Sequence, residues 1–345
     1  MINKIIFIRR DNIGDLVCTT PAIAAARQSF PGAKIGILVN TYNADIVSNN
    51  PDINEVYVYK KAKHSTDKGK WSIWLDNARL LLRIRREKYD VAIGCGSFSP
   101  MLARYTLLTG AKRRIGYCRR GSTNVSKNVY YTDPICPTEG SEHETIKIFR
   151  LLEPIGIAGR PGRMIVYPLR QEMDKFAAFR TVHRSYRARP LIAIAISARI
   201  KANKWPVEKF AELISTLLDR NEENILLLWA PGSRDNPTFP GENEIAQDII
   251  DRFTGRILAY PTSTISSLIA AIAASDIVVT LDTGSLHISA GLQKPTVALM
   301  TKAKEPSWYP WDTRNIVISA DKNVEAIPVG TVVGAVEKLL HEMVT

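Results

Sequence analysis

Short apolar runs rich in β-branched residues alternate along the chain with longer stretches whose apolar residues recur three and four positions apart. The first pattern predicts buried strands and the second predicts helices. The expected strands are Lys4–Arg9, Lys34–Asn40, Glu55–Tyr59, Asp90–Cys95, Arg113–Tyr117, Leu191–Ser197, Ile225–Ala230, Arg256–Tyr260, Ile277–Leu281 and Thr296–Met300. The expected helices are Leu16–Ser29, Tyr42–Asn49, Ser72–Lys88, Pro100–Thr109, Glu142–Ile157, Val207–Arg220, Glu242–Phe253, Thr264–Ser275, Ser285–Leu292 and Thr331–Met343.

Strict alternation of strand and helix predicts an α/β protein with parallel sheets that are covered on both faces. A chain of 345 residues suits two domains better than one core. The segment "GIAGRPGR", rich in Gly, Pro and Arg, predicts a boundary near residue 160. We therefore expect two doubly wound, Rossmann-like domains, 1–160 and 161–345, that face each other across a cleft. The last helix would be free to pack back towards the first domain.

The positive charge is concentrated in one half of the chain. Residues 1–160 contain 25 Lys and Arg against 14 Asp and Glu, whereas the remaining residues contain 21 against 20. Much of the excess lies between Lys60 and Lys88. This asymmetry predicts that the first half meets an anion or an anionic surface, although a solvated basic helix would give the same pattern.

Several classes of site have no signature in this sequence. The four cysteines lack metal-ligand spacing, and scattered thiols of this kind are typical of a cytoplasmic protein. There is no Walker A sequence, no H-E-x-x-H, no G-x-S-x-G and no D-x-D pair. No apolar run is long enough to span a bilayer, and the N-terminus does not resemble a signal peptide. We expect a soluble protein that needs no metal or other cofactor and binds phosphates through Lys, Arg, hydroxyls and helix N-termini.

Three loops at the predicted carboxyl ends of strands contain candidate chemistry, because ligands bind at that edge of open α/β sheets. The first loop, "RRDNIGD", brings Gly14 and Asp15 to the start of a helix expected near Leu16. Asp15 there fits a capping role and a functional role about equally. The loop lacks the glycine pattern of a dinucleotide site, which disfavours a dehydrogenase.

The second loop, "SARIKANKWP", starts at Ser197 and contains Lys204; it predicts either a phosphate-binding loop or an exposed basic surface. The third, "TLDTGSLHISAGLQKPTVAL", turns from an apolar strand into a helix at Asp282, Thr283 and Gly284. A helix N-terminus in that position attracts a diphosphate. His287 on this helix is, by itself, more typical of a structural histidine.

Taken in order, these loops resemble glycosyltransferase family 9, the ADP-heptose:lipopolysaccharide heptosyltransferases. The resemblance extends over most of the chain and rests on Asn12–Asp15, on "TPA" from Thr20, on "NKWP", and on the pattern D-T-G-x-x-H-x-x-A that starts at Asp282. It implies a GT-B fold and an inverting, metal-independent sugar transfer. The stretch "ALMTKAKEPSWYPW" departs from the family, in which a Gly-Pro element often follows this strand.

The resemblance also implies roles for individual residues. Asp15 and Lys204 correspond to the catalytic base and to the phosphate-binding lysine. The donor-binding set is Gly14, Ser197, Lys204, Thr262, Asp282, Thr283, Gly284 and His287, and the acceptor-binding set is Arg10, Lys60, Lys61, Lys63, Arg119 and Arg120. The implied partners are ADP-heptose, a lipopolysaccharide core acceptor and the anionic cytoplasmic face of the inner membrane, with no nucleic acid.

Two other functions remain open at this point. A GT-B transferase or epimerase that uses a different nucleotide sugar fits the same loops. A non-enzymatic protein that binds polyanions fits the charge but lacks every nucleic-acid-binding signature. The sequence also leaves the identity of the acceptor open.

Overall fold

The computed structural model describes residues 1–60, 70–119, 129–182, 189–221, 224–233, 235–236 and 241–344. The chain divides into two compact units, an N-terminal unit (Met1–Met164) and a C-terminal unit (Ile165–Thr345). In the part of the chain that is described, no helix has both the length and the apolar composition required to cross a bilayer.

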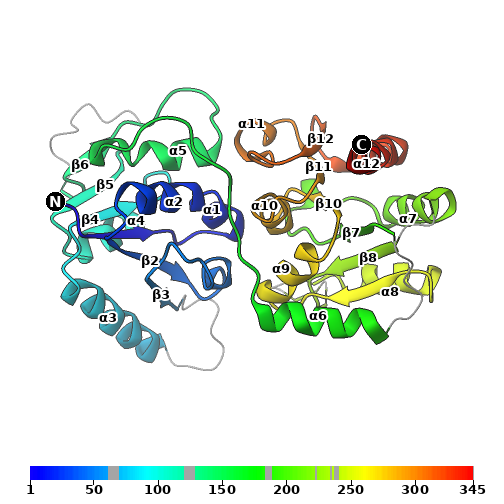
Figure 1. Ribbon diagram of the computed structural model, residues 1–345, viewed down its shortest axis with the longest axis horizontal. Helices are drawn as coiled ribbons and strands as arrows, with labels where there is room; N and C mark the ends of the chain where they lie inside the picture. The colour runs from blue at the N-terminus through cyan, green and yellow to red at the C-terminus, as the bar shows by residue number, and fades with distance from the viewer. Residues whose placement is uncertain are drawn as a thin grey trace. The chain divides into compact units, whose positions relative to one another are not determined.

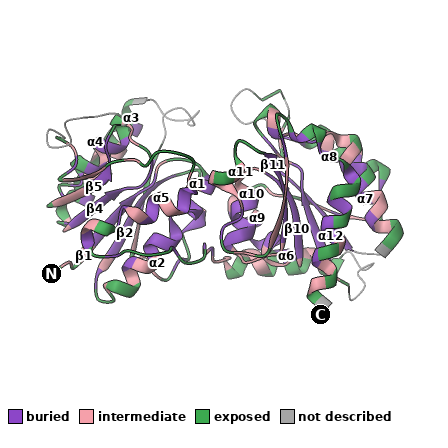
Figure 2. Cartoon of the chain, turned by 90° about the horizontal axis from the view of Figure 1, so that it is seen from above, coloured by how far each residue is buried: buried purple, intermediate pink, exposed green. Residues whose placement is uncertain are grey.

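The N-terminal unit is built on one parallel sheet (Figure 1). Its described strands are β1 (Lys4–Ile8), β2 (Lys34–Asn40), β3 (Glu55–Tyr59), β4 (Val91–Gly94), β5 (Arg113–Tyr117) and β6 (Asp133–Ile135). Their spatial order is β3-β2-β1-β4-β5-β6. The central strands are buried, as Figure 2 shows, because helices cover both faces of the sheet.

Helices and short turns follow most of these strands. They are α1 (Ile13–Val17), α2 (Thr20–Ser29), η1 (Ala44–Ile46), α3 (Lys70–Arg86), α4 (Pro100–Leu108), α5 (Glu144–Arg150) and η4 (Glu153–Ile155). Ile84 of α3 and Leu102 of α4 share a core cluster with Ile6 and Ile8 of β1, so α3 and α4 cover the same face of the sheet.

The C-terminal unit repeats the same winding. Its described strands are β7 (Leu191–Ala195), β8 (Asn224–Trp229), β9 (Leu258–Pro261), β10 (Ile277–Leu281), β11 (Thr296–Thr301) and β12 (Asn315–Ala320), in the order β12-β11-β10-β7-β8-β9. Its helices are α6 (Arg170–Val182), η5 (Lys201–Asn203), α7 (Val207–Asn221), α8 (Asn243–Arg252), α9 (Ile265–Ala273), α10 (Gly284–Gly291), α11 (Glu305–Trp308), η6 (Val324–Ala326) and α12 (Val329–Val344). Both described sheets are entirely parallel, which confirms the predicted fold class.

Some predicted elements were wrong. The helix expected from Leu16 begins at Ile13 and ends at Val17, and a second helix starts at Thr20, because Pro21 has no N–H to continue the first one. The helix expected over Tyr42–Asn49 is only the short turn η1. There, side-chain amides compete with helical hydrogen bonds, since the Asn40 backbone N–H donates to the side chain of Asn43.

The strand order reverses at one place in each sheet, between β1 and β4 and between β7 and β10. Loops that leave the carboxyl ends of strands at such a point diverge and leave room for a ligand. The loops after β1 and β10 were singled out from the sequence, and so was the loop after β7. The structure therefore places all three at the switch points of their own sheets.

Candidate functional site

In the N-terminal unit, the side chain of Arg9 joins the two loops of the switch point. Arg9 follows β1 and is almost completely buried, with 1% of its surface exposed. One guanidinium nitrogen donates to the carbonyl oxygen of Cys95, directly after β4, over 2.8 Å. Sequence reasoning treated Arg9 as part of a basic loop and missed this role, because nothing in "RRDN" distinguishes a buried arginine from an exposed one.

The other terminal nitrogen of Arg9 binds two carboxylates. It lies 2.5 Å from Oδ1 of Asp15 and 2.9 Å from Oε1 of Glu144, which opens α5. A third carboxylate, that of Asp11, lies 3.7 Å from Nε. Burial alone would lower the pKa of Arg9, but these carboxylates outweigh it and raise the pKa. A charged guanidinium is stable inside the unit because opposite charges surround it.

Asp15 also caps the helix on which it lies. Its Oδ2 accepts hydrogen bonds from the backbone N–H of Asn12, over 2.9 Å, and from the Asn12 side-chain amide, over 3.1 Å. Asn12 is therefore the N-cap and Asp15 is the third residue of α1, so the helix starts earlier than the expected position near Leu16, and Asp15 caps it from inside the first turn. Gly14, buried in this first turn, was predicted to bind the donor.

The environment of Asp15 keeps it ionised. Burial by itself would raise the pKa of this carboxyl, but the charge of Arg9 and the hydrogen bond from the Asn12 backbone outweigh it, so the pKa lies below its ordinary value. About 14% of the side chain is exposed. An ionised, oriented and partly accessible carboxylate at the carboxyl end of a strand has the properties that a general base requires.

The side chain of Arg10 lies over two neighbouring aromatic rings. Its guanidinium carbon is 4.8 Å from the ring centroid of Tyr59 and 4.2 Å from that of Tyr105. Burial raises the pKa of Tyr59 to about 12, so this ring remains neutral beside the cation. Contacts with two aromatic faces hold the charge of Arg10 in place.

The other predicted acceptor residues are spread over the surface. Lys60 forms an exposed ion pair with Asp76 of α3, over 3.0 Å, and Arg119 is exposed after β5. Lys61, Lys63 and Arg120 lie outside the described residues.

In the C-terminal unit, Asn203 and Asp282 join the loops of the switch point. The side-chain amide of Asn203 donates to the backbone oxygen of Asp282 over 2.9 Å and to its Oδ2 over 3.2 Å. Burial raises the pKa of Asp282, although the hydrogen bond from Asn203 and the charge of Lys304 oppose this shift. Lys304 belongs to the stretch that departs from the family pattern, so a cation from that stretch acts on the turn that was predicted to bind the donor.

The turn after β10 leads directly into helix α10. Thr283 is its N-cap residue, and the hydroxyls of Thr280, Ser285 and Thr283 are linked, with oxygen separations of 2.5 and 2.8 Å. This network fixes the first turn of α10, whose free N–H groups attract an anion. His287 is buried on the same helix, and its ring packs edge-on against Trp308 of α11 at 5.6 Å between centroids.

Lys204 is held by a buried carboxylate. Its Nζ lies 2.9 Å from Oε1 of Glu242, whose side chain is 4% exposed against 34% for that of Lys204. The following residue, Trp205, is buried and donates its indole N–H to the carbonyl oxygen of Ile327, which anchors the loop. The partnership with Glu242 was not predicted, because 38 residues separate the two along the chain.

The hydroxyls of the two remaining predicted donor residues form hydrogen bonds with backbone atoms at the carboxyl edge of the sheet. The Ser197 hydroxyl accepts from the backbone N–H of Ala230 over 2.8 Å. The Thr262 hydroxyl donates to the carbonyl oxygen of Trp229 over 2.8 Å. These contacts connect the carboxyl ends of β7, β8 and β9.

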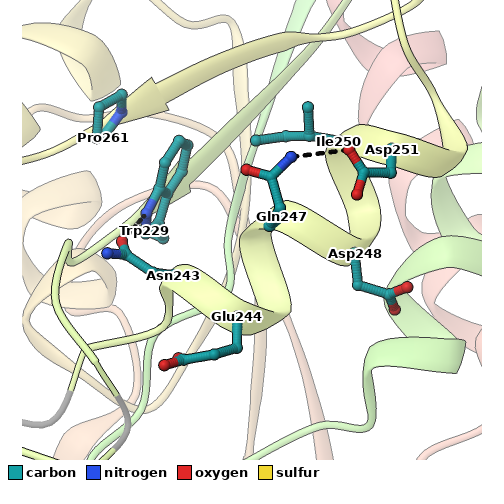
Figure 3. A pocket seen from close by; sticks show the side chains of 8 residues that line it. All are labelled: Trp229, Asn243, Glu244, Gln247, Asp248, Ile250, Asp251 and Pro261. Atoms are coloured by element: carbon teal, nitrogen blue, oxygen red, sulfur yellow. Dashed lines mark hydrogen bonds between the residues drawn. The ribbon is translucent and has the colours of Figure 1, made fainter.

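An open hollow lies on the same unit beside α8 (Figure 3). Its lining residues are Trp229, Asn243, Glu244, Gln247, Asp248, Ile250, Asp251 and Pro261. None of the predicted site residues lines it. Its lining residues include three carboxylates and no Lys or Arg, so this hollow supplies no cation for the donor phosphates.

Comparisons with known proteins identify the family. The sequence model of glycosyltransferase family 9 (heptosyltransferase) matches residues 77–329 of this chain. The chain belongs to this family. It is a glycosyltransferase of the heptosyltransferase family, which confirms the resemblance drawn from the three loops.

Relatives of this family 9 glycosyltransferase match it almost end to end. It is 26% identical over 361 residues to lipopolysaccharide heptosyltransferase 3 of Escherichia coli, covering 96% of this chain and 98% of that one. The crystal structure of a family 9 glycosyltransferase from Veillonella parvula matches with a TM-score of 0.83 and 18% identity, covering 99% and 97% of the two chains. The E. coli heptosyltransferase WaaC with ADP-2-deoxy-2-fluoro heptose matches with a TM-score of 0.71 and 18% identity, covering 97% and 99%. These matches confirm the expected GT-B fold.

Proposed function

We propose that this glycosyltransferase transfers heptose from ADP-heptose to the inner core of lipopolysaccharide, with inversion and without a metal ion. The N-terminal unit would bind the acceptor and the C-terminal unit the donor. The names of the relatives and the ADP-heptose analogue bound by WaaC support this substrate pair. The observation that carries the proposal is the ionised Asp15 carboxylate, oriented by Arg9 and Asn12.

Asp15 acts as the general base. It accepts the proton of an acceptor hydroxyl while that oxygen attacks the anomeric carbon of the heptose. The new C–O bond forms on one face of the sugar as the bond to the ADP phosphate breaks on the other, so the configuration inverts. A carboxylate whose pKa is low is already deprotonated at neutral pH and needs no prior activation.

The charge that develops on the departing ADP meets Lys204 and the N-terminal N–H groups of α10. The ammonium of Lys204 has three N–H donors, so it keeps its contact with Glu242 and donates its other hydrogen bonds to the phosphate oxygens. Thr283 and Gly284 hold the start of α10 for the same task. Charge compensation by these groups takes the place of a metal ion.

The acceptor is anionic and belongs to the membrane. Arg10, Lys60 and Arg119 supply positive charge for its phosphates and carboxylates. We place the reaction at the cytoplasmic face of the inner membrane, where a basic N-terminal half is attracted to anionic lipids.

The decisive experiment replaces Asp15 with Asn, which preserves size and removes basicity. We expect transfer from ADP-heptose to a truncated lipopolysaccharide to fall by about 10²- to 10⁴-fold. Donor binding measured by calorimetry should persist. The control is Asp11→Asn, a neighbouring carboxylate that is 53% exposed and lies farther from Arg9. Undiminished transfer in Asp15→Asn would leave Asp15 as a capping residue and refute the mechanism.

The nucleotide is tested separately by thermal shift. ADP should raise the melting temperature more than UDP or GDP at equal concentration, and transfer should continue in EDTA. A preference for UDP or GDP would assign the same chemistry to a different sugar donor.

A further inference from the structure

Helix α3 of the N-terminal unit exposes an apolar face that no described element covers. Trp71 is 81% exposed, Trp74 64%, Leu82 54% and Leu75 47%. Positions 71, 74, 75, 78 and 82 follow helical spacing, so these side chains form one stripe. The Trp71 and Trp74 rings contact each other edge to face, with centroids 6.5 Å apart. Single exposed apolar residues are ordinary, whereas a contiguous stripe marks an interaction surface.

A second set of apolar side chains, on another face of α3, packs the helix against the unit. Ile73 and Ile84 are buried, and Leu80 packs against the core cluster that α3 shares with the sheet. The helix packs beside β3, at the edge of the unit (Figure 1). The fold therefore already uses one apolar face of α3, and the exposed stripe remains turned to solvent.

Cations border the exposed stripe. Arg79 follows Leu75 by four positions, and Arg86 follows Leu82 by four positions, which puts both on the same side of the helix as the apolar residues. Arg85 also belongs to this side and is exposed. The helix contains five Lys and Arg and one acidic residue, Asp76. An apolar face with a basic border is the composition of a helix that lies in the interface of an anionic bilayer.

Helix α4 extends this surface over the same face of the sheet. Met101, Leu107 and Leu108 are 49%, 37% and 45% exposed, and Arg104 is exposed between them. Arg85 lies directly against Gly110, where α4 ends, because a Cβ built on that glycine would be 3.2 Å from the Cγ of Arg85. The basic end of α3 therefore lies against the turn that follows α4.

We propose that the exposed face of α3, formed by Trp71, Trp74, Leu75 and Leu82 and bordered by Arg79, Arg85 and Arg86, docks into the headgroup region of an anionic phospholipid bilayer. The indole rings lie at the depth that tryptophan prefers in membranes, and the arginines contact lipid phosphates. The charge selects this occupant, because a second copy of the chain would bring like charges together. The inference rests on the proposed function in so far as the acceptor is embedded in that membrane.

The experiment uses the full chain without donor or acceptor. Vesicles of phosphatidylcholine alone and with one third phosphatidylglycerol are floated with the protein, and tryptophan emission is recorded. We expect binding to the mixed vesicles only, a blue-shifted emission, and release by salt. Trp71→Ser/Trp74→Ser should abolish the blue shift and lower partitioning at least ten-fold. Arg79→Gln/Arg86→Gln should lower partitioning about five-fold for each arginine removed.

Matched controls come from the other unit. Val182→Ser replaces a side chain that is 78% exposed on α6, and Arg170→Gln removes an exposed arginine on the same helix. Neither should change partitioning, and all variants should keep their melting temperature. The proposal would be overturned if Trp71→Ser/Trp74→Ser bound the mixed vesicles as well as the wild type does. It would also be overturned if the wild type bound vesicles of phosphatidylcholine alone equally well. A concentration-dependent dimer that disappears in the Trp71→Ser/Trp74→Ser variant while vesicles remain unbound would overturn it as well.

A second readout separates this inference from the proposed reaction. The α3 variants should transfer heptose to a detergent-solubilised acceptor at the wild-type rate, because none of the altered residues belongs to the proposed site. If the wild type binds vesicles but transfers no heptose, the proposed reaction is refuted and the proposed membrane-binding face of α3 is supported. If the wild type transfers heptose but binds no vesicles, the membrane-binding face is refuted and the reaction is supported.

Discussion

Arg9 and Asp15 form an ion pair of 2.5 Å that joins the end of the first strand to the first turn of the first helix. The pair has two consequences. It fixes the orientation of the carboxylate, and it holds the pKa of Asp15 below its ordinary value although burial alone would raise it. A base on this scaffold therefore remains ionised over the whole physiological range.

The first prediction follows from that pKa. In the wild type, kcat/KM should show no loss attributable to Asp15 as the pH falls from 8 to 5, because its acid limb lies below the ordinary aspartate value of about 3.9. Replacing Arg9 with Gln removes the charge that lowers the pKa and leaves burial to raise it. The acid limb should then lie at a higher pH than in the wild type. A pH profile of kcat/KM for both proteins measures the shift.

The control for this profile is Arg170→Gln, which removes an exposed arginine from α6. Its acid limb should coincide with that of the wild type. If Arg9→Gln folds and its profile also coincides with the wild type, Arg9 does not set the protonation of the base.

The second prediction concerns stability. Glu144 binds both Arg9 and, at 3.7 Å, Lys147, and it is 8% exposed. Glu144→Gln keeps the shape but removes the negative charge of the group that accepts from Arg9, so the free energy of unfolding should fall by about 1–3 kcal/mol. Urea denaturation monitored by fluorescence at pH 7 measures this change. A difference below about 0.5 kcal/mol would show that Asp15 alone neutralises Arg9.

The third prediction concerns how the free energy of unfolding changes with pH. A carboxyl whose folded pKa is depressed stabilises the fold above its unfolded pKa, and this contribution is lost as the pH falls through the folded value. The contribution of Asp15 to the free energy of unfolding should therefore be constant from pH 8 to 5 and should decline only below about pH 4. Asp15→Asn should flatten that acid decline when chemical denaturation is repeated along the pH series.

The sheet frame was predictable because its central strands are uninterrupted apolar runs. β1, β7 and β10 contain the runs "IIFI", "LIAIA" and "IVV", which are typical of strands buried on both faces. The edge strands β6 and β12 were missed because they are short or only half-buried, so their polar positions hide the pattern. The same is true of α6, in which Phe176 is buried but most other positions are polar.

The site was predictable only in part. The positions of the loops and of the helix N-termini follow from the order of predicted strands and helices along the chain, and these positions predicted Asp15 and Asp282 as site residues. The partners of these residues come from distant segments, as Glu144 does for Arg9, and local periodicity contains no information about such pairings. The same limit applies to Glu242, whose position before α8 gives no sign that its carboxylate reaches Lys204.

The last prediction separates the two residues of that pair. Lys204→Ala should lower kcat by about 10²- to 10³-fold, because it removes a preorganised cation that meets charge in the transition state. Glu242→Gln keeps the cation and loosens only its anchor, so the KM for the donor should change a few-fold and kcat much less. Steady-state kinetics with intact ADP-heptose distinguish the two patterns. Equal losses of kcat in both variants would mean that Glu242 takes part in the reaction and does more than hold Lys204 in place.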